Sequence, residues 1–177
     1  RDLSNLVYPS NPFGFRTYIR GEVKEFQGST KLITSDNVGY VKRSEISKSI
    51  DAIDTYNVIM TRAMSGGNKA GTDGKYQIVP ATMRVMEPNE ICAETYICIG
   101  NFRKKEEAQN LKTYLSTMFA RFLMLQAMSS IMISKDSFQF VPLQDFSHPW
   151  TDEMLYKKYG LTEEEIAFIE SMIRPME

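Results

Sequence analysis

Seven cationic or amide side chains are the candidates for binding chemistry in this sequence. They fall on expected loops or strand ends and are Arg16, Lys42, Arg43, Arg62, Asn68, Lys69 and Lys75. Such side chains donate hydrogen bonds to guanine, adenine and phosphate edges, so their pattern predicts contacts with nucleic acid. Arg62 is the most suggestive, because it ends an expected strand and leads into the glycine-rich segment 64–75. For any single residue, ordinary solvated charge is an equally good interpretation.

Asn11-Pro12-Phe13-Gly14 resembles the catalytic motif of adenine methylation but departs from it. That chemistry needs Asn or Asp, two prolines and an aromatic ring to hold a flipped adenine. Here Phe13 stands where the second proline belongs, and only ten residues precede the motif, too few for a unit that binds a methyl donor. We therefore interpret it as a rigid turn.

Two further motifs suggest hydrolysis. Glu22-Val23-Lys24 matches half of a restriction-type metal site, which also needs an acid such as Asp36 on a neighbouring strand to share a divalent cation. Alternating surface charge explains it more simply. His148 is the single histidine, and no nucleophile stands in a recognisable strained turn beside it, so we expect a packing or capping role.

The charge is unevenly distributed, although the net charge is −1. Residues 1–150 carry 18 Lys and Arg against 15 Asp and Glu, whereas residues 151–177 carry 3 against 7. A balance of +3 permits a basic face for DNA without requiring one. The balance of −4 in the tail repels phosphates, which disfavours its helix-turn-helix-like pattern as a DNA reader.

The elements that must position these residues form a mixed α/β pattern. The first hundred residues predict a twisted, mainly antiparallel sheet with strands at 18–23, 31–34, 39–42, 57–62, 82–86 and 91–99. The last of these is apolar on both faces and predicts a central strand. Segment 64–75 between strands is polar and glycine-rich, which indicates a mobile binding loop.

Helical periodicity begins at Lys104. Apolar residues recur at three and four residues through 104–133, which predicts one amphipathic helix or two consecutive ones backing the sheet. In the tail, Thr151 is an expected cap for a helix over 152–159. Thr162 and Glu165 form an expected capping box for a helix to Arg174, whose apolar face (Ile166, Ile169, Ile173) would cover the core.

Cys92 and Cys98 are the two cysteines. Both fall in the expected strand 91–99, which would hold the thiols far apart on one face. Small buried apolar side chains in a reducing cytosol are therefore the expectation, not a disulfide or a metal site.

Several segments together resemble a known family, the bacterial type II restriction–modification adenine-specific DNA methyltransferases, in their C-terminal target-recognition (TaqI-like specificity) domain. The resemblance covers nearly the whole chain. It rests on the element at 11–17, Glu94-Thr95-Tyr96, the helical segment 106–111 with Tyr114-Leu115, Phe140-Val141-Pro142-Leu143-Gln144-Asp145-Phe146 and the ending 149–162.

The resemblance implies a recognition domain (1–150) with a helical appendage (151–177) that follows a methyltransferase domain absent from this chain. That absent domain would use S-adenosylmethionine, and double-stranded DNA in the bacterial cytoplasm would be the partner of both. An opening at Arg1 without a methionine agrees with a fragment that has no catalysis of its own. Two alternatives stay open, a metal-dependent endonuclease fragment and a protein-docking domain.

Overall fold

The computed structural model describes residues 1–64, 69–78 and 82–176. In these ranges the chain forms two small sheets and four α-helices, which is the mixed α/β fold with mainly antiparallel pairing that the sequence predicted. The strands are β1 (Ser29–Ile33), β2 (Val38–Lys42), β3 (Tyr56–Thr61), β4 (Arg84–Met86), β5 (Glu90–Cys92) and β6 (Tyr96–Phe102). The α-helices are α1 (Lys105–Leu115), α2 (Met118–Ala127), α3 (Asp152–Lys158) and α4 (Glu163–Met172).

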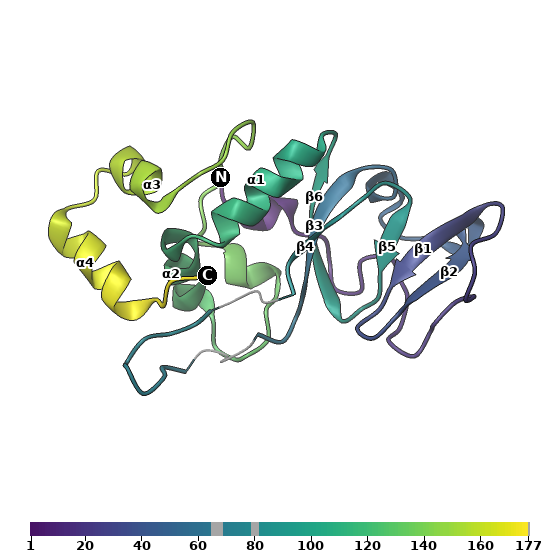
Figure 1. Ribbon diagram of the computed structural model, residues 1–177, viewed down its shortest axis with the longest axis horizontal. Coiled ribbons are helices and arrows are strands. Elements are labelled where there is room, and N and C mark those ends of the chain that lie inside the picture. The colour runs from purple at the N-terminus through teal and green to yellow at the C-terminus, as the bar shows by residue number, and fades with distance from the viewer. Residues whose placement is uncertain (65–68, 79–81, 177) are drawn as a thin grey trace.

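The strands form two sheets of three, where the sequence predicted one. One sheet has the order β2-β1-β5, with β1 antiparallel to β2 and parallel to β5. The other has the order β4-β3-β6, and both of its pairings are antiparallel. In Figure 1 the first sheet lies at one end of the long axis, and α3 and α4 lie at the other.

A turn at residues 93–95 divides the apolar run that was expected to be one central strand over 91–99. Its first part pairs with β1 as β5, and its second part pairs with β3 as β6. The Ala93 N–H donates to Ile33 O over 2.9 Å, whereas the Tyr96 N–H turns back to Ala93 O over 3.1 Å. Both halves are buried, so hydropathy alone did not reveal the break; the polar pair Glu94-Thr95 marks it.

The expected burial of both cysteines is confirmed, whereas this turn corrects the expected separation of their thiols. Cys92 and Cys98 are free and buried, and both belong to the core between the two sheets. Their thiols are near enough to share a hydrogen bond. Burial raises the pKa of the Cys98 thiol well above its ordinary value, and the contact with Cys92 raises it further. The prediction of widely separated thiols was wrong, since it assumed a continuous strand.

The expected strand at 18–23 is not formed. Glu22 alone pairs with Tyr40, as an isolated bridge beside β2. Gly21 has φ of 73°, outside the extended region, and Val23 is 88 % exposed. The segment still runs close to β2, because a Cβ on Gly39 would lie 1.6 Å from Arg20 O.

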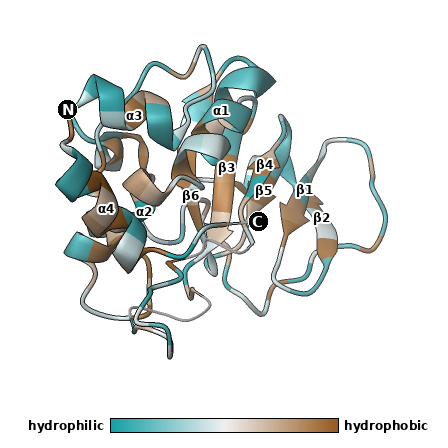
Figure 2. Cartoon of the chain, turned by 60° about the vertical axis from the view of Figure 1, so that its left-hand side comes forward, coloured by the Kyte–Doolittle hydropathy of each residue, from teal (hydrophilic) through white to brown (hydrophobic). Residues whose placement is uncertain are grey.

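The β4-β3-β6 sheet separates two hydrophobic cores. On β3, Val58 and Met60 face the helices, whereas Ile59 between them faces the other sheet. On β6, Ile97 and Ile99 alternate with Cys98 in the same way. Figure 2 shows β3 as an almost continuously apolar ribbon, as expected for a strand covered on both faces.

The expected helical stretch 104–133 is two helices, one of the two predicted forms, but it ends earlier. The hydroxyl of Thr117 accepts from Ala120 N over 3.1 Å and begins α2, which ends at Ala127. Residues beyond it run beside the segment after β3: Ala63 and Met132 form an antiparallel bridge. These residues therefore lie at the candidate site.

The tail helices begin at the predicted caps. Thr151 accepts from Met154 N over 3.2 Å, and Thr162 and Glu165 form the predicted capping box. Ile169 and Ile173 are buried in the main core and Ile166 is half-buried, so this face covers the core as expected. No helix of the described ranges has the length and apolar character needed to cross a bilayer.

A buried arginine anchors the tail. Arg121 on α2 has no exposed surface, and its Nη1 donates to Gln77 O over 2.8 Å and to Arg174 O over 2.7 Å. Its Nε donates to Ser116 O and Thr117 O. Burial lowers the pKa of Arg121 to about 10, so the guanidinium stays charged at neutral pH and joins three segments through their carbonyls.

Candidate functional site

A cleft of about 510 Å³ lies where three segments meet: the turn at Asn11, the end of β3 and the turn between β5 and β6. We call it the waist cleft. Its volume is within the roughly 300–1,000 Å³ typical of ligand sites. It is lined by Ser10, Asn11, Arg16, Thr17, Ser35, Thr61, Arg62, Ala63, Glu94, Thr95 and Met132.

The Asn11 turn forms one wall. Asn11 has φ of 52°, a left-handed conformation that asparagine tolerates better than most residues, and Gly14 N donates to Asn11 O over 3.2 Å. Buried Phe13 anchors the turn, and the Ser49 hydroxyl donates to Pro12 O over 2.6 Å. The prediction of a turn at Asn11-Pro12-Phe13-Gly14 is confirmed.

Backbone hydrogen bonds join the other walls. Arg62 N donates to Thr95 O over 2.9 Å, and Arg62 O accepts from Ile133 N over 2.6 Å. Glu94 N donates to Phe15 O over 2.9 Å, which brings the β5–β6 turn against the segment of Arg16. The lining residues are therefore held by main-chain contacts between segments that are distant in sequence.

Two buried acceptors in the waist cleft lack a partner. Asn11 Oδ1 and Thr95 Oγ1 are buried, and neither makes a hydrogen bond within the described residues. A buried polar atom without a partner costs about 1–3 kcal/mol, and most such atoms in proteins are satisfied. Both atoms belong to side chains that line the same cleft, and because neither atom is exposed, a ligand would reach them only after these side chains rotate.

The cleft has a small positive balance, from two arginines and one glutamate. Arg16 Nη1 lies 3.2 Å from Glu94 Oε2, and the Arg16 side chain is 63 % exposed. Arg62 is half-buried and forms no ion pair in the parts of the chain that the structure describes. It also lines a neighbouring hollow of about 220 Å³ with Lys135 and Asp136. The guanidinium N–H groups of Arg62 are therefore not used by any carboxylate of the described residues.

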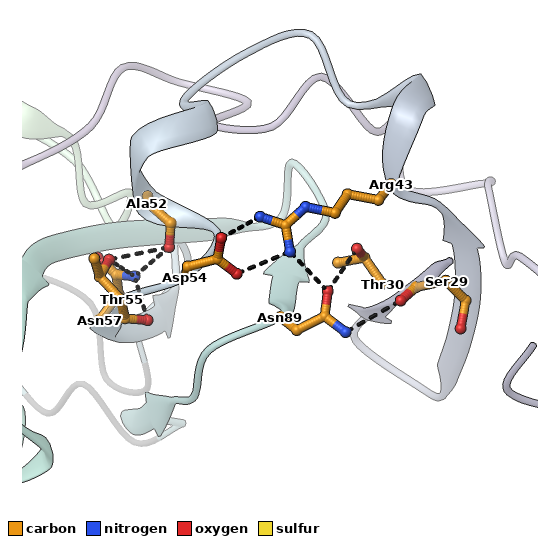
Figure 3. Close-up of polar contacts among 8 residues, drawn as sticks. All are labelled: Ser29, Thr30, Arg43, Ala52, Asp54, Thr55, Asn57 and Asn89. Carbon is orange, nitrogen blue, oxygen red and sulfur yellow. Dashed lines mark hydrogen bonds and ion pairs between the residues drawn. The ribbon is translucent and has the colours of Figure 1, made fainter. Parts of the chain in front are cut away.

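Lys42 lies at the end of β2 and Arg43 directly after it, and neither lines the waist cleft. Lys42 ends β2 and is exposed. Arg43 Nη1 donates to Asp54 Oδ1 over 2.8 Å and approaches Asn89 Oδ1 at 3.4 Å, and its Nη2 pairs with Asp54 Oδ2 (Figure 3).

The contacts of Asn89 extend this network. Asn89 also accepts from Thr30 Oγ1 over 2.8 Å and donates to Ser29 O over 3.1 Å, so the network joins β1 to the segments before β3 and β5 (Figure 3). The ion pair lowers the pKa of Asp54, first through the hydrogen bond from Arg43. Arg43 therefore has a structural role here.

The glycine-rich segment contributes two described cations, and neither lines the waist cleft. Lys69 is exposed and Lys75 half-buried. Gly71 N donates to Lys75 O, and Asp73 pairs with Arg174 at 3.1 Å, so this turn stands against the end of the chain. Asn68 lies outside the described residues.

The motifs of the hydrolytic hypotheses lie elsewhere. Glu22 and Lys24 are exposed beside β2. His148 packs on Trp150 with ring centroids 4.6 Å apart, in agreement with the expected packing role. Within residues 1–64, 69–78 and 82–176, no three His, Cys, Asp or Glu side chains converge as a metal site would require.

Sequence reasoning therefore included Arg16 and Arg62 but missed the polar atoms beside them. Asn11 was assigned to the turn alone, and Thr95 to the interior of a strand. One signal was present for Thr95: a Glu-Thr pair interrupts an otherwise apolar run. Comparisons with protein-family models, with curated proteins and with solved structures find no match for this chain.

Proposed function

We propose that this chain is a DNA sequence-recognition module of a restriction–modification adenine methyltransferase, and that the waist cleft contacts base edges. The observation that carries the proposal is the set of groups in that cleft. A half-buried guanidinium without an ion-pair partner in the described residues lies in the same cleft as two buried acceptors without partners, Asn11 Oδ1 and Thr95 Oγ1.

This set matches what a base pair offers in the major groove. Guanine offers two acceptors, O6 and N7, to an arginine, and cytosine and adenine offer amino donors to an amide or hydroxyl oxygen. A phosphate alone could accept from Arg62 and from the Thr95 hydroxyl, but it has no donor at neutral pH for Asn11 Oδ1. The chemistry of the cleft therefore favours base contacts over backbone contacts.

In this proposal the chain selects the DNA and a separate catalytic domain, using S-adenosylmethionine, methylates the adenine. The family resemblance supports this division of roles. We expect weak and salt-sensitive DNA binding by the chain alone, since the second half of the DNA clamp would be supplied by the catalytic domain.

The test is selection of duplexes from a randomised library by the 177-residue chain, followed by fluorescence anisotropy on the enriched duplex at about 50 and 200 mM salt. The proposal expects a consensus that is lost in Arg62→Ala and retained in Arg103→Ala. Arg103 is the matched control: it is exposed and follows the far end of β6, roughly 25 Å from Thr95 along the strand. Enrichment of no sequence by the wild type, or an unchanged consensus in Arg62→Ala, would refute it.

A further inference from the structure

A second hollow, separate from the waist cleft, lies between α2 and the tail helix α4. It has a volume of about 390 Å³ and we call it the tail groove. Its floor is apolar and its rim carries two acids. The lining residues are Phe119, Phe122 and Leu123 of α2, Leu161, and Glu164, Glu165, Phe168 and Ile169 of α4.

The apolar floor is open to solvent. Phe168 is 56 % exposed, and its ring meets Phe122 edge-on with centroids 5.9 Å apart. Figure 1 shows α3 and α4 at the end of the long axis opposite the β2-β1-β5 sheet, and Figure 2 shows alternating polar and apolar ribbon along α4. A large exposed aromatic beside an apolar hollow is typical of an interaction site.

The rim is acidic and its charges are not neutralised internally. Glu163, Glu164, Glu165 and Glu170 are all exposed on α4, and none of them forms an ion pair within the described residues. Glu165 is used in the cap of α4, where its Oε1 accepts from Thr162 N. Glu164 therefore presents negative charge at the rim of the tail groove, and Glu170 lines the hollow beside it.

A neighbouring hollow of about 470 Å³ continues this surface. Asp152, Glu153 and Glu170 line it against a single lysine, Lys157. Tyr156 also lines it, and its buried hydroxyl has no hydrogen-bond partner in the described ranges. The two hollows adjoin at Leu161, which lines both, and both have acidic side chains among their lining residues.

We propose that the tail groove binds a basic amphipathic helix of a partner protein. Leucine or methionine side chains of that helix would fill the space beside Phe122 and Phe168, and its lysines or arginines would face Glu164 and Glu170. A helix laid between two helices is a common way to close such a groove. Duplex DNA is disfavoured because its phosphates would meet these carboxylates.

A second copy of this chain is also disfavoured as the occupant. Symmetric pairing through the groove would place the glutamates of one α4 against those of the other, and like charges at short range repel. This inference is independent of the proposed function, since none of its residues lines the waist cleft.

The probe is a labelled leucine–lysine peptide of about 18 residues, or about five helical turns, whose leucines fall on one helical face. A peptide of the same composition with scrambled order has the same charge but no apolar face. In fluorescence anisotropy, the proposal expects the amphipathic peptide to bind at least about tenfold more tightly than the scrambled one.

Matched variants locate the contact. Phe168→Ser and Glu164→Lys should each weaken peptide binding about tenfold. Phe140→Ser and Glu106→Lys should leave it unchanged, because Phe140 is 51 % exposed and Glu106 exposed on parts of the chain that do not line the groove. Circular dichroism and thermal unfolding of each variant exclude misfolding as the cause, and Glu164→Gln gives a milder second variant.

Three results would overturn the proposal. They are equal binding of the two peptides, insensitivity of the binding to both groove variants, and a dimer in sedimentation equilibrium that Phe168→Ser dissociates. The last result would assign the groove to a second copy. DNA selection through Arg62 is unaffected by any of these outcomes, so failure here is distinguishable from failure of the proposed function.

Discussion

The backbone N–H of Arg62 donates to the carbonyl oxygen of Thr95 over 2.9 Å, which joins the end of β3 to the turn between β5 and β6. This contact brings two residues 33 positions apart to one cleft. The cleft is lined both by Arg62 and by Thr95, whose buried hydroxyl has no hydrogen-bond partner in the described residues. Two of the predictions below follow from it.

Replacement of Arg62 should remove discrimination between DNA sequences. If Arg62 contacts a guanine edge, Arg62→Ala should cost about 1–3 kcal/mol of discrimination between the selected duplex and a mismatched one. Arg62→Lys should not restore the discrimination, because lysine lacks the planar guanidinium that donates to O6 and N7 of guanine at the same time. Competition anisotropy measures both, with Arg103→Ala as the control. Equal discrimination by Arg62→Ala and wild type would contradict the assignment.

Thr95→Val should affect stability and binding in opposite directions. Valine has nearly the same shape but no hydroxyl, so the unpaired buried Oγ1 disappears and the unliganded protein should be about 1 kcal/mol more stable. Binding of the selected duplex should weaken. Urea unfolding and anisotropy on the same samples test the pair.

Thr30→Val is the matched control for Thr95→Val. Thr30 Oγ1 donates to Asn89 Oδ1 over 2.8 Å, so this change breaks a formed hydrogen bond and should destabilise the protein by about 1 kcal/mol without affecting base recognition. If Thr95→Val destabilised the chain as Thr30→Val does, the Thr95 hydroxyl would have a partner already, and its role as a free acceptor would be excluded.

Arg121→Ala should destabilise the chain by about 2–4 kcal/mol. The change leaves a cavity, and it deprives the carbonyls of Gln77 and Arg174 of their buried donor. The loss should be local first: hydrogen exchange should accelerate at Tyr76 and Arg174, whose amides pair the residue just after the glycine-rich segment with the end of the chain. Arg103→Ala again serves as the surface control, with no expected change.

Acid should weaken the Arg43–Asp54 pair. The folded-state pKa of Asp54 lies below its ordinary value of 3.8. The ion pair therefore stabilises the folded protein fully at pH values above 3.8, and this stabilisation is lost as the pH falls through the lowered pKa. Both side chains are largely exposed, so the contribution is limited to about 0–1 kcal/mol. In Arg43→Gln, NMR titration should show the pKa of Asp54 returning upward; an unchanged pKa would mean that the pair is not formed in solution.

The two thiols should be unreactive in the folded protein. Burial, and then the neighbouring Cys92, raise the pKa of the Cys98 thiol, which disfavours the reactive thiolate at pH 7–8. A thiol reagent such as DTNB should therefore modify neither cysteine until urea unfolds the chain, when both should react. Rapid modification of the native protein would show that the core between the two sheets opens readily.

Local chemistry predicted much of this protein. The caps at Thr151 and Thr162 and the Asn11 turn depend on side chains and neighbours within a few residues, so the sequence alone was sufficient for them. The mixed α/β composition followed from the change of hydrophobic period near Lys104, for the same reason.

Only the tertiary structure decided which polar residues meet. It divided segment 91–99 between two sheets, brought the two thiols near one another, paired Arg43 with Asp54, and placed Arg16 and Arg62 beside Asn11 and Thr95. A residue's type states which hydrogen bonds it can make, but its partner is set by contacts between distant segments. Those contacts depend on which buried strand pairs with which, and an apolar run that is buried on both faces carries no mark of its partner.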